Sequence, residues 1–91
     1  MYRIIDKRGT GKTSRLMLLA KENNGVLVCI NPYATYEKAK AYGLIGFDII
    51  SYSEYIEQEY DMSKPCYIDD LEGFVKYVSG NALAGYSISE D

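Results

Sequence analysis

A glycine-containing run near the amino terminus carries residue types whose spacing could hold a phosphate group. The run reads Gly9-Thr10-Gly11-Lys12-Thr13-Ser14. Two glycines let the backbone adopt conformations that a side chain would obstruct, and they let its amides approach an anion closely. The lysine brings a positive charge to the phosphates, and the hydroxyl group after it is a ligand for Mg²⁺. The run therefore predicts a loop that binds a nucleoside triphosphate.

The full phosphate-binding pattern, Walker A, is Gly, four residues, Gly, Lys and then Ser or Thr. Asp6 stands where its first Gly belongs, and the rest is intact, with Arg8 inside the loop as a further contact. By chance, Gly-x-Gly-Lys-Ser/Thr would arise in roughly 0.3% of chains of this length. A carboxylate near bound phosphates weakens binding by like-charge repulsion unless it points away. We therefore expect binding, with a reduced affinity.

A second group of candidate residues follows an apolar run later in the chain. Residues 65–69 read as a strand that ends in Asp69, and Asp70 and Glu72 come directly after it. This is the form of a Walker B strand, whose last Asp holds Mg²⁺, usually through water. We expect Asp69 to share the metal with Thr13, and Asp70 or Glu72 to activate the attacking water. The simpler alternative is that an Asp at such a place is an ordinary helix N-cap.

Strand-like and helix-like segments alternate along the whole chain. Strands are expected at residues 2–5, 26–30, 47–51, 65–69 and 83–88, and helices at 13–22, 32–42, 52–60 and 71–78. The third helix opens on Ser51 and Glu54, which have the spacing of a capping box. Such alternation favours a parallel sheet with right-handed crossovers. We expect one α/β domain over residues 1–91, a three-layer sandwich whose mostly parallel sheet has about five strands. Ligands of such sheets bind at the carboxyl ends of the strands, where Lys12 and Asp69 would meet.

Composition excludes several classes of function. The chain has no histidine, which removes Ser-His-Asp and Cys-His nucleophiles. The net charge is −3 and the basic residues are dispersed, so autonomous binding to nucleic acid is disfavoured. Cys29 and Cys66 lie in apolar runs and are expected to be buried, reduced thiols. The ten tyrosines suit half-buried faces, although an exposed cluster of them would mark a surface for a partner.

The location follows from what the sequence does not contain. No stretch approaches the roughly 20 apolar residues that a membrane span needs. The amino terminus carries the phosphate-binding run itself, so it does not read as a signal peptide. We therefore expect a cytoplasmic protein that has no contact with a membrane.

Taken together, the motifs and their order carry a resemblance. Gly9–Thr13, a second strand followed by Asn31-Pro32, a third strand ending in Ser51 and the run Tyr67-Ile-Asp-Asp70 resemble the N-terminal core of helicase-like and terminase-like P-loop ATPases. More closely, the chain is similar to very short P-loop proteins encoded by phages and prophages of Gram-positive bacteria. That resemblance implies nucleotide binding. Asp6 and Asp70, which replace the first Gly and the catalytic Glu, bear on hydrolysis more than on binding.

Two functions compete. The first is a minimal ATPase that binds ATP with Mg²⁺ and hydrolyses it slowly, with stimulation by a protein partner or a homo-oligomer because no arginine finger is evident. The second is a non-catalytic nucleotide-binding adaptor or inhibitor that acts on a larger host or phage protein. A small-molecule kinase fits poorly, because nothing in the sequence supplies a substrate lid with arginines.

Overall fold

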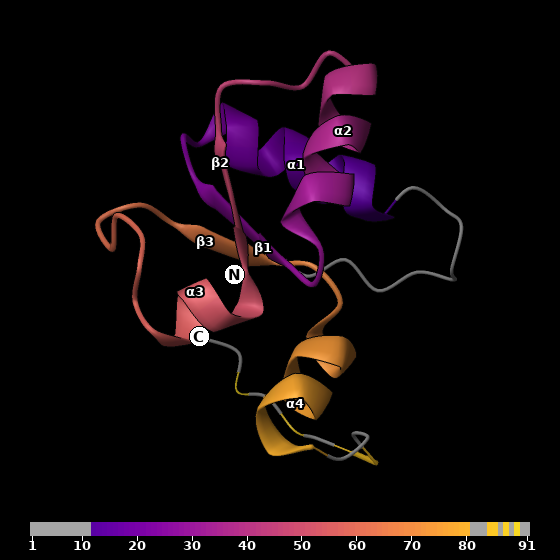
Figure 1. Cartoon of the computed structure of the whole chain (residues 1–91), viewed down its shortest axis with the longest axis vertical. Coiled ribbons are helices and arrows are strands. Elements are labelled where there is room, and N and C mark those ends of the chain that lie inside the picture. The colour runs from indigo at the N-terminus through magenta and orange to yellow at the C-terminus, as the bar shows by residue number, and fades with distance from the viewer. Residues whose placement is uncertain (1–11, 81–83, 86, 88, 90–91) are drawn as a thin grey trace.

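The structure is a computed structural model that describes residues 12–80, Ala84, Gly85, Ser87 and Ser89, with the backbone alone for Lys12. Helices and strands alternate along the described chain (Figure 1). In chain order they are α1 (Lys12–Glu22), β1 (Val26–Cys29), α2 (Pro32–Ala41), β2 (Asp48–Ser51), α3 (Tyr52–Ile56), β3 (Cys66–Ile68) and α4 (Leu71–Ser79).

The three described strands form a parallel sheet in the order β2-β1-β3. Val26 of β1 pairs with Asp48 of β2 and with Cys66 of β3, so the central strand is paired along both edges. All four residues of β1 are buried, as the uninterrupted apolar run predicted. Because the strands are parallel, their carboxyl ends lie at one edge of the sheet, where α2, α3 and α4 begin.

Helices pack on both faces of this sheet. Alternate residues of a strand point to opposite faces, and here they enter two separate apolar clusters. Leu27 packs with Met17 of α1 and Ala39 of α2, whereas Val26 and Val28 pack with the residues of the opposite cluster. That second cluster contains Ile50 and Tyr52, with Tyr55, Tyr60, Cys66, Ile68 and Phe74 packed against it. The expected α/β architecture with a parallel sheet is therefore present.

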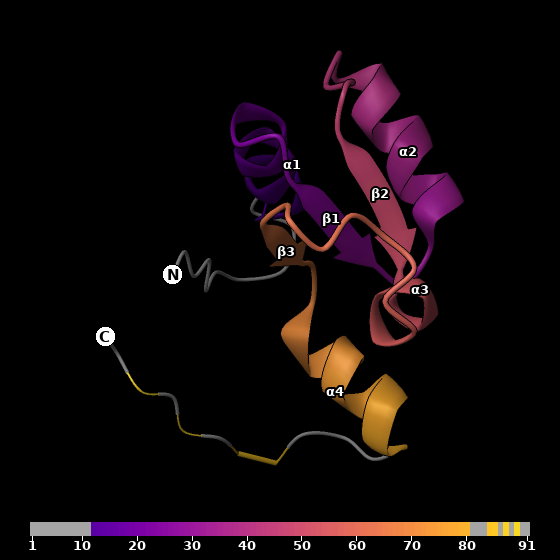
Figure 2. The same cartoon turned by 90° about the vertical axis from the view of Figure 1, so that its left-hand side faces the viewer.

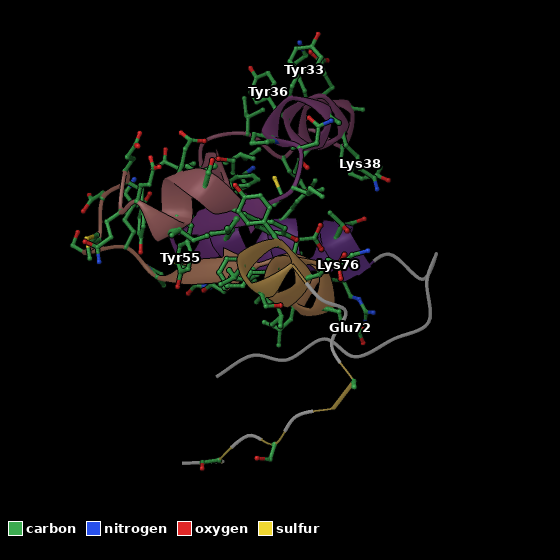
Figure 3. All side chains as sticks on the ribbon, turned by 60° about the horizontal axis from the view of Figure 1, so that its bottom comes forward. Tyr33, Tyr36, Lys38, Tyr55, Glu72 and Lys76 are labelled. Carbon is green, nitrogen blue, oxygen red and sulfur yellow. The ribbon has the colours of Figure 1, made fainter. Side chains whose placement is uncertain are left out.

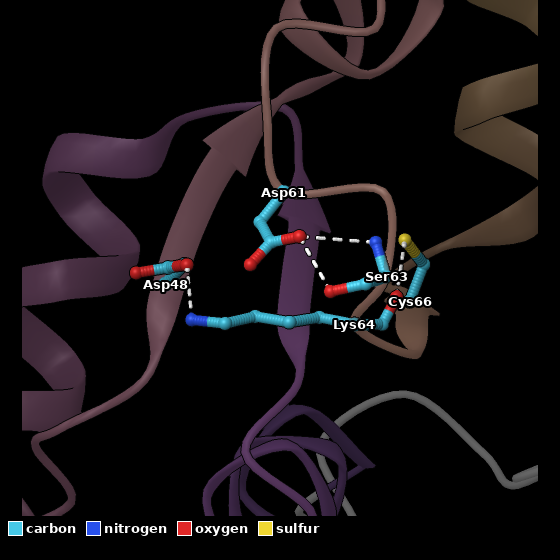
Figure 4. Close-up of polar contacts among 5 residues, drawn as sticks. All are labelled: Asp48, Asp61, Ser63, Lys64 and Cys66. Carbon is cyan, nitrogen blue, oxygen red and sulfur yellow. Dashed lines mark hydrogen bonds and ion pairs between the residues drawn. The ribbon is translucent and has the colours of Figure 1, made fainter.

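An ion pair spans the sheet at its amino end. Lys64, just before β3, extends across β1 so that its Nζ atom lies 3.0 Å from Oδ2 of Asp48, the first residue of β2 (Figure 4). Asp61 orders the loop that precedes Lys64, because the Oδ1 atom of Asp61 accepts hydrogen bonds from the amide and hydroxyl groups of Ser63. These two bonds lower the pKa of Asp61. Both outer strands are thus tied together at the end opposite to the predicted site.

The helix beginning at Tyr52 is shorter than the sequence suggests. Its capping box is present, because the Ser51 side chain accepts from the amide of Glu54 and the Glu54 side chain accepts from the amide of Ser51. The helix ends at Ile56 instead of residue 60, however. Gln58 takes a left-handed conformation with φ 60°, and the amide of Glu59 donates to the carbonyl of Glu54. This pair of features is a Schellman motif, which closes the helix.

Two of the expected strands are not part of the described sheet. The predicted strand at residues 2–5 lies outside the described residues, as do residues 83, 86 and 88 of the predicted strand at the carboxyl terminus. Ala84, Gly85, Ser87 and Ser89 are described, and they belong to no strand. Of the two cysteines, Cys29 is buried as expected, whereas Cys66 is half-buried, and both are free.

The tyrosines divide between the core and the surface. Tyr52 is buried, whereas Tyr33, Tyr36 and Tyr42 on and after α2 are exposed. Figure 3 shows Tyr33 and Tyr36 pointing away from the rest of the molecule. No described helix is long and apolar enough to cross a membrane.

Candidate functional site

The first turn of α1 meets the end of β3 through a contact between two side chains. The hydroxyl of Thr13 lies 3.2 Å from Oδ1 and 3.3 Å from Oδ2 of Asp69, and it donates to this carboxylate. Both distances exceed the usual 2.5–3.0 Å of such bonds, so this hydrogen bond is weak. The two residues are 56 positions apart in the sequence. Thr13 and Asp69, which the sequence predicts to share one metal ion, therefore lie side by side.

The backbone of Asp69 is held by two further elements. Its amide donates to the carbonyl of Val28 in β1 at 2.9 Å, which continues the ladder of the sheet by one residue. Its carbonyl accepts a hydrogen bond of 2.8 Å from the hydroxyl of Tyr52, the first residue of α3. With Thr13 of α1, three elements fix the position of this one carboxylate.

The amino end of α1 suits an anion. The first amides of a helix have no partners within the helix and carry a partial positive charge. No acidic residue lies in the first turn of α1 to compete for them. Thr13 and Ser14 in this turn are half-buried, and Lys12 is its first residue. The rest of the predicted loop, Arg8, Gly9, Thr10 and Gly11, lies outside the described residues, as does the side chain of Lys12.

Asp70 caps the following helix. It is the N-cap of α4, and its Oδ1 accepts a hydrogen bond of 3.1 Å from the amide of Gly73. Its backbone is left-handed, with φ 60° and ψ 75°. The carboxylate lies so close to the helix that a Cβ atom on Gly73 would stand 2.4 Å from Oδ2. Asp70 is therefore directed at the first turn of α4.

Glu72 belongs to the first turn of α4 and is exposed. It appears in Figure 3 on the outer side of that helix. An acidic side chain at this position stabilises the positive end of the helix dipole. The position thus has an ordinary structural explanation beside the predicted catalytic one.

A buried thiol lies near the turn formed by Asp69 and Asp70 between β3 and α4. Cys29 ends β1, and its Sγ atom is 3.6 Å from the carbonyl oxygen of Ile50. Burial raises the pKa of Cys29, and the Asp69 carboxylate adds to this, while hydrogen bonds from Thr35 and from the backbone of Asn31 oppose it. The thiol therefore stays protonated at neutral pH, and a protonated thiol is a poor nucleophile.

Sequence reasoning did not single out Tyr52. Its hydroxyl touches the carbonyls of Asp69 and of Asp70, at 2.8 and 3.1 Å, so it belongs to the candidate site. The only signal was its place, directly after the strand that ends in Ser51. In a chain with ten tyrosines that place was not distinctive.

Within the described part of the chain, no group of three or more Asp, Glu, Cys or His side chains is placed to hold a metal ion. A cation at Thr13 and Asp69 would need phosphate or water oxygens as its other ligands. Comparison of the chain with protein-family models, curated proteins and solved structures gave no match.

Proposed function

We propose that this chain binds a nucleoside triphosphate, ATP together with Mg²⁺, between the amino end of α1 and the carboxyl end of β3. The observation that carries the proposal is the contact between Thr13 and Asp69. In P-loop proteins a hydroxyl directly after the lysine and an Asp at the end of a strand share the metal ion. In this chain two residues from those two motifs touch.

The motif and the fold support the same location. The amides of Gly9 to Lys12 would surround the phosphates, and the Lys12 ammonium would add a point charge. We propose that residues 2–5 add a strand to the described sheet, which would extend it towards the three-layer P-loop core that the sequence predicts. Such a core is what the resemblance to short phage and prophage P-loop proteins implies. A cytoplasmic location would supply the ATP.

The available groups fit Mg²⁺. This ion prefers oxygen ligands, keeps several waters, and is usually bound by one or two carboxylates together with phosphates. Thr13 and Asp69 offer a hydroxyl and a carboxylate, and the long bond between them could be exchanged for contacts with a cation. When bound, Mg²⁺ would neutralise charge on the phosphates. Asp69, held by β1 and Tyr52, would need little rearrangement to take part.

Hydrolysis would depend on Asp70 or Glu72, the two carboxylates predicted to activate water. A water-activating carboxylate must reach the attacking water. Glu72 is exposed in the first turn of α4, and the carboxylate of Asp70 accepts a bond from the amide of Gly73. The engaged Asp70 favours the second candidate function, a nucleotide-binding adaptor or inhibitor module with little turnover. If ATP is hydrolysed, we expect it to be slow and to need a protein partner or a second copy of the chain.

A thermal-shift experiment tests binding. ATP with Mg²⁺ at a hundredfold excess over its Kd should stabilise the wild-type protein by about 2.7 kcal/mol. The Lys12→Ala variant should lose most of this shift. Lys21→Ala is the matched control, because it removes the same charge from the last turn of the same helix. Equal shifts in all three proteins would refute the proposal.

Phosphate release separates the two candidate functions. Steady turnover that is lost in both Asp69→Ala and Lys12→Ala would establish an ATPase. ATP binding without turnover would establish the module.

A further inference from the structure

Tyr52 connects three elements at the candidate site. It is the first residue of α3 and directly follows the end of β2, and only 2% of its surface is exposed. Its ring packs against two aromatic rings of α4, edge-on to Phe74 at 5.2 Å and tilted against Tyr77 at 5.7 Å between ring centroids. The hydroxyl is thereby brought to the turn between β3 and α4.

That turn has an unusual backbone. Asp70 is a non-glycine residue in a left-handed conformation, which is sparsely populated and persists where the surroundings enforce it. Here the carbonyls of Asp69 and Asp70 lie on the same side, 2.8 and 3.1 Å from the Tyr52 hydroxyl. Two carbonyls that face the same way repel each other. The single proton of the Tyr52 hydroxyl, shared between the two oxygens, offsets this repulsion.

The hydroxyl keeps its proton over the whole physiological range. Burial raises the pKa of Tyr52 to about 12, and the nearby carboxylates of Asp70 and Asp69 add to this. A neutral phenol can donate to a carbonyl, whereas a phenolate cannot. The contact is therefore constant, and it does not act as a pH switch near neutrality.

We propose that Tyr52 is a positioning residue for the nucleotide–metal site, and this rests on the function proposed above. Its hydroxyl holds the Asp69–Asp70 turn in the conformation that directs the Asp69 carboxylate towards Thr13. The amide of Asp69 is fixed by β1, so the carbonyl is the remaining backbone group through which this residue can be oriented.

The attachment of α4 supports this assignment. No residue of α4 is buried, and Figure 2 shows the helix projecting from the sheet. Its contacts with the rest of the chain include the rings of Tyr52 and Tyr55 against Phe74. The turn that leads into this weakly packed helix is supported by the hydrogen bonds from Tyr52, which directly follows β2.

The test compares two substitutions that each remove one hydroxyl from the same aromatic cluster. Tyr52→Phe keeps the ring and removes the donor to the two carbonyls. Tyr55→Phe is the matched control, because Tyr55 packs against Phe74 and Tyr60, at 5.6 and 5.5 Å between centroids, and no described hydrogen bond joins it to the turn. ATP binding is measured for both variants and the wild type in EDTA and over a series of Mg²⁺ concentrations.

Tyr52→Phe should raise the Mg²⁺ concentration for half-maximal enhancement of ATP binding about tenfold, as loss of a residue that orients a metal ligand typically does. Binding in EDTA should change by less than about twofold, because the phosphate-binding loop is untouched. Tyr55→Phe should match the wild type in both conditions. A change confined to the Mg²⁺ series is not expected of a purely structural role.

Each other outcome has a definite meaning. An unchanged Mg²⁺ dependence in Tyr52→Phe, or an equal effect of the two substitutions, would overturn the positioning role while leaving the proposed function intact. Failure of Tyr52→Phe to unfold cooperatively would also overturn it, since the hydroxyl would then be a general structural requirement. Absence of ATP binding in the wild type would refute the proposed function itself, and the positioning role with it.

Discussion

The hydroxyl of Thr13 lies between 3.2 and 3.3 Å from both carboxylate oxygens of Asp69. Thr13 lies in the first turn of a helix near the amino terminus, and Asp69 follows the last described strand. The parallel sheet brings them together, because α1 packs on the face of β1 and β3 while the end of β3 lies at the carboxyl edge. Several measurable consequences follow from this arrangement and from the packing that maintains it.

Neighbouring residues of α1 should differ sharply in their effect on stability. Met17 is fully buried, whereas 44% of Leu18 is exposed. Met17→Ala should lower the free energy of unfolding by about 2–5 kcal/mol, because it leaves a cavity between α1 and the sheet. Leu18→Ala should cost less than about 1 kcal/mol. Urea denaturation of both variants checks this, and equal costs would show that α1 packs with another face.

A methyl group on Gly73 should disturb the turn formed by Asp69 and Asp70. Its Cβ would stand 2.4 Å from Oδ2 and 2.9 Å from Cγ of Asp70. Gly73→Ala should therefore cost about 1–3 kcal/mol, despite the better helix propensity of alanine. Gly85→Ala is the control, because a Cβ there would meet no atom of the described residues within 4 Å. Thermal unfolding of the two variants measures the difference, and a stabilised Gly73→Ala would contradict the described position of Asp70.

Stability should fall at alkaline pH in a way that depends on Tyr52. The pKa of Tyr52 is raised from 10.0 to about 12 in the folded protein. Between these values the unfolded chain loses a proton that the folded chain retains, so the stabilisation present below pH 10 is lost as the pH approaches 12. Denaturant unfolding at pH 9 and at pH 11.5, about half a unit below the folded pKa, should show a smaller loss in Tyr52→Phe. The remaining loss would include Tyr60, whose pKa is also raised to about 12. Identical losses in wild type and Tyr52→Phe would count against a buried hydroxyl.

The ion pair across the amino end of the sheet should contribute modestly. Lys64→Met should lower the free energy of unfolding by about 0.2–1 kcal/mol at low salt, and less at high salt because the pair is screened. Lys40→Met is the control, because its pair with Glu37 is 3.7 Å long and both side chains are about half exposed. A salt-independent cost for Lys64→Met would indicate that its aliphatic stem, not its charge, makes the contribution.

The sequence predicted the parts of the fold that depend on local pattern. A strand was predicted at residues 26–30 and is found at Val26–Cys29, because this uninterrupted apolar run is what a strand covered on both faces requires. The capping box at Ser51 and Glu54 was also predictable, because both its bonds are made within four residues. The early end of α3 was not, since Gln58 has no special preference for the left-handed backbone that closes the helix.

For the candidate site too, some features could be predicted from sequence patterns and others could not. Thr13 and Asp69 were predicted as parts of two motifs that share a metal ion, so their nearness could be anticipated from a parallel sheet. Tyr52 could not be anticipated, because its partners are backbone carbonyls, which leave no trace in residue types. The hydrogen bond from Gly73 to Asp70 could be foreseen only as the general tendency of Asp to cap a helix.

The most direct test of the account is Mg²⁺-dependent ATP binding by two variants of Thr13, measured by titration calorimetry. Thr13→Ser keeps the hydroxyl that contacts Asp69, whereas Thr13→Val keeps the shape and removes it. We expect Thr13→Ser to retain the enhancement of ATP affinity by Mg²⁺ and Thr13→Val to lose about 10-fold or more of it. An enhancement by Mg²⁺ that is equal in Thr13→Val and the wild type would contradict the account.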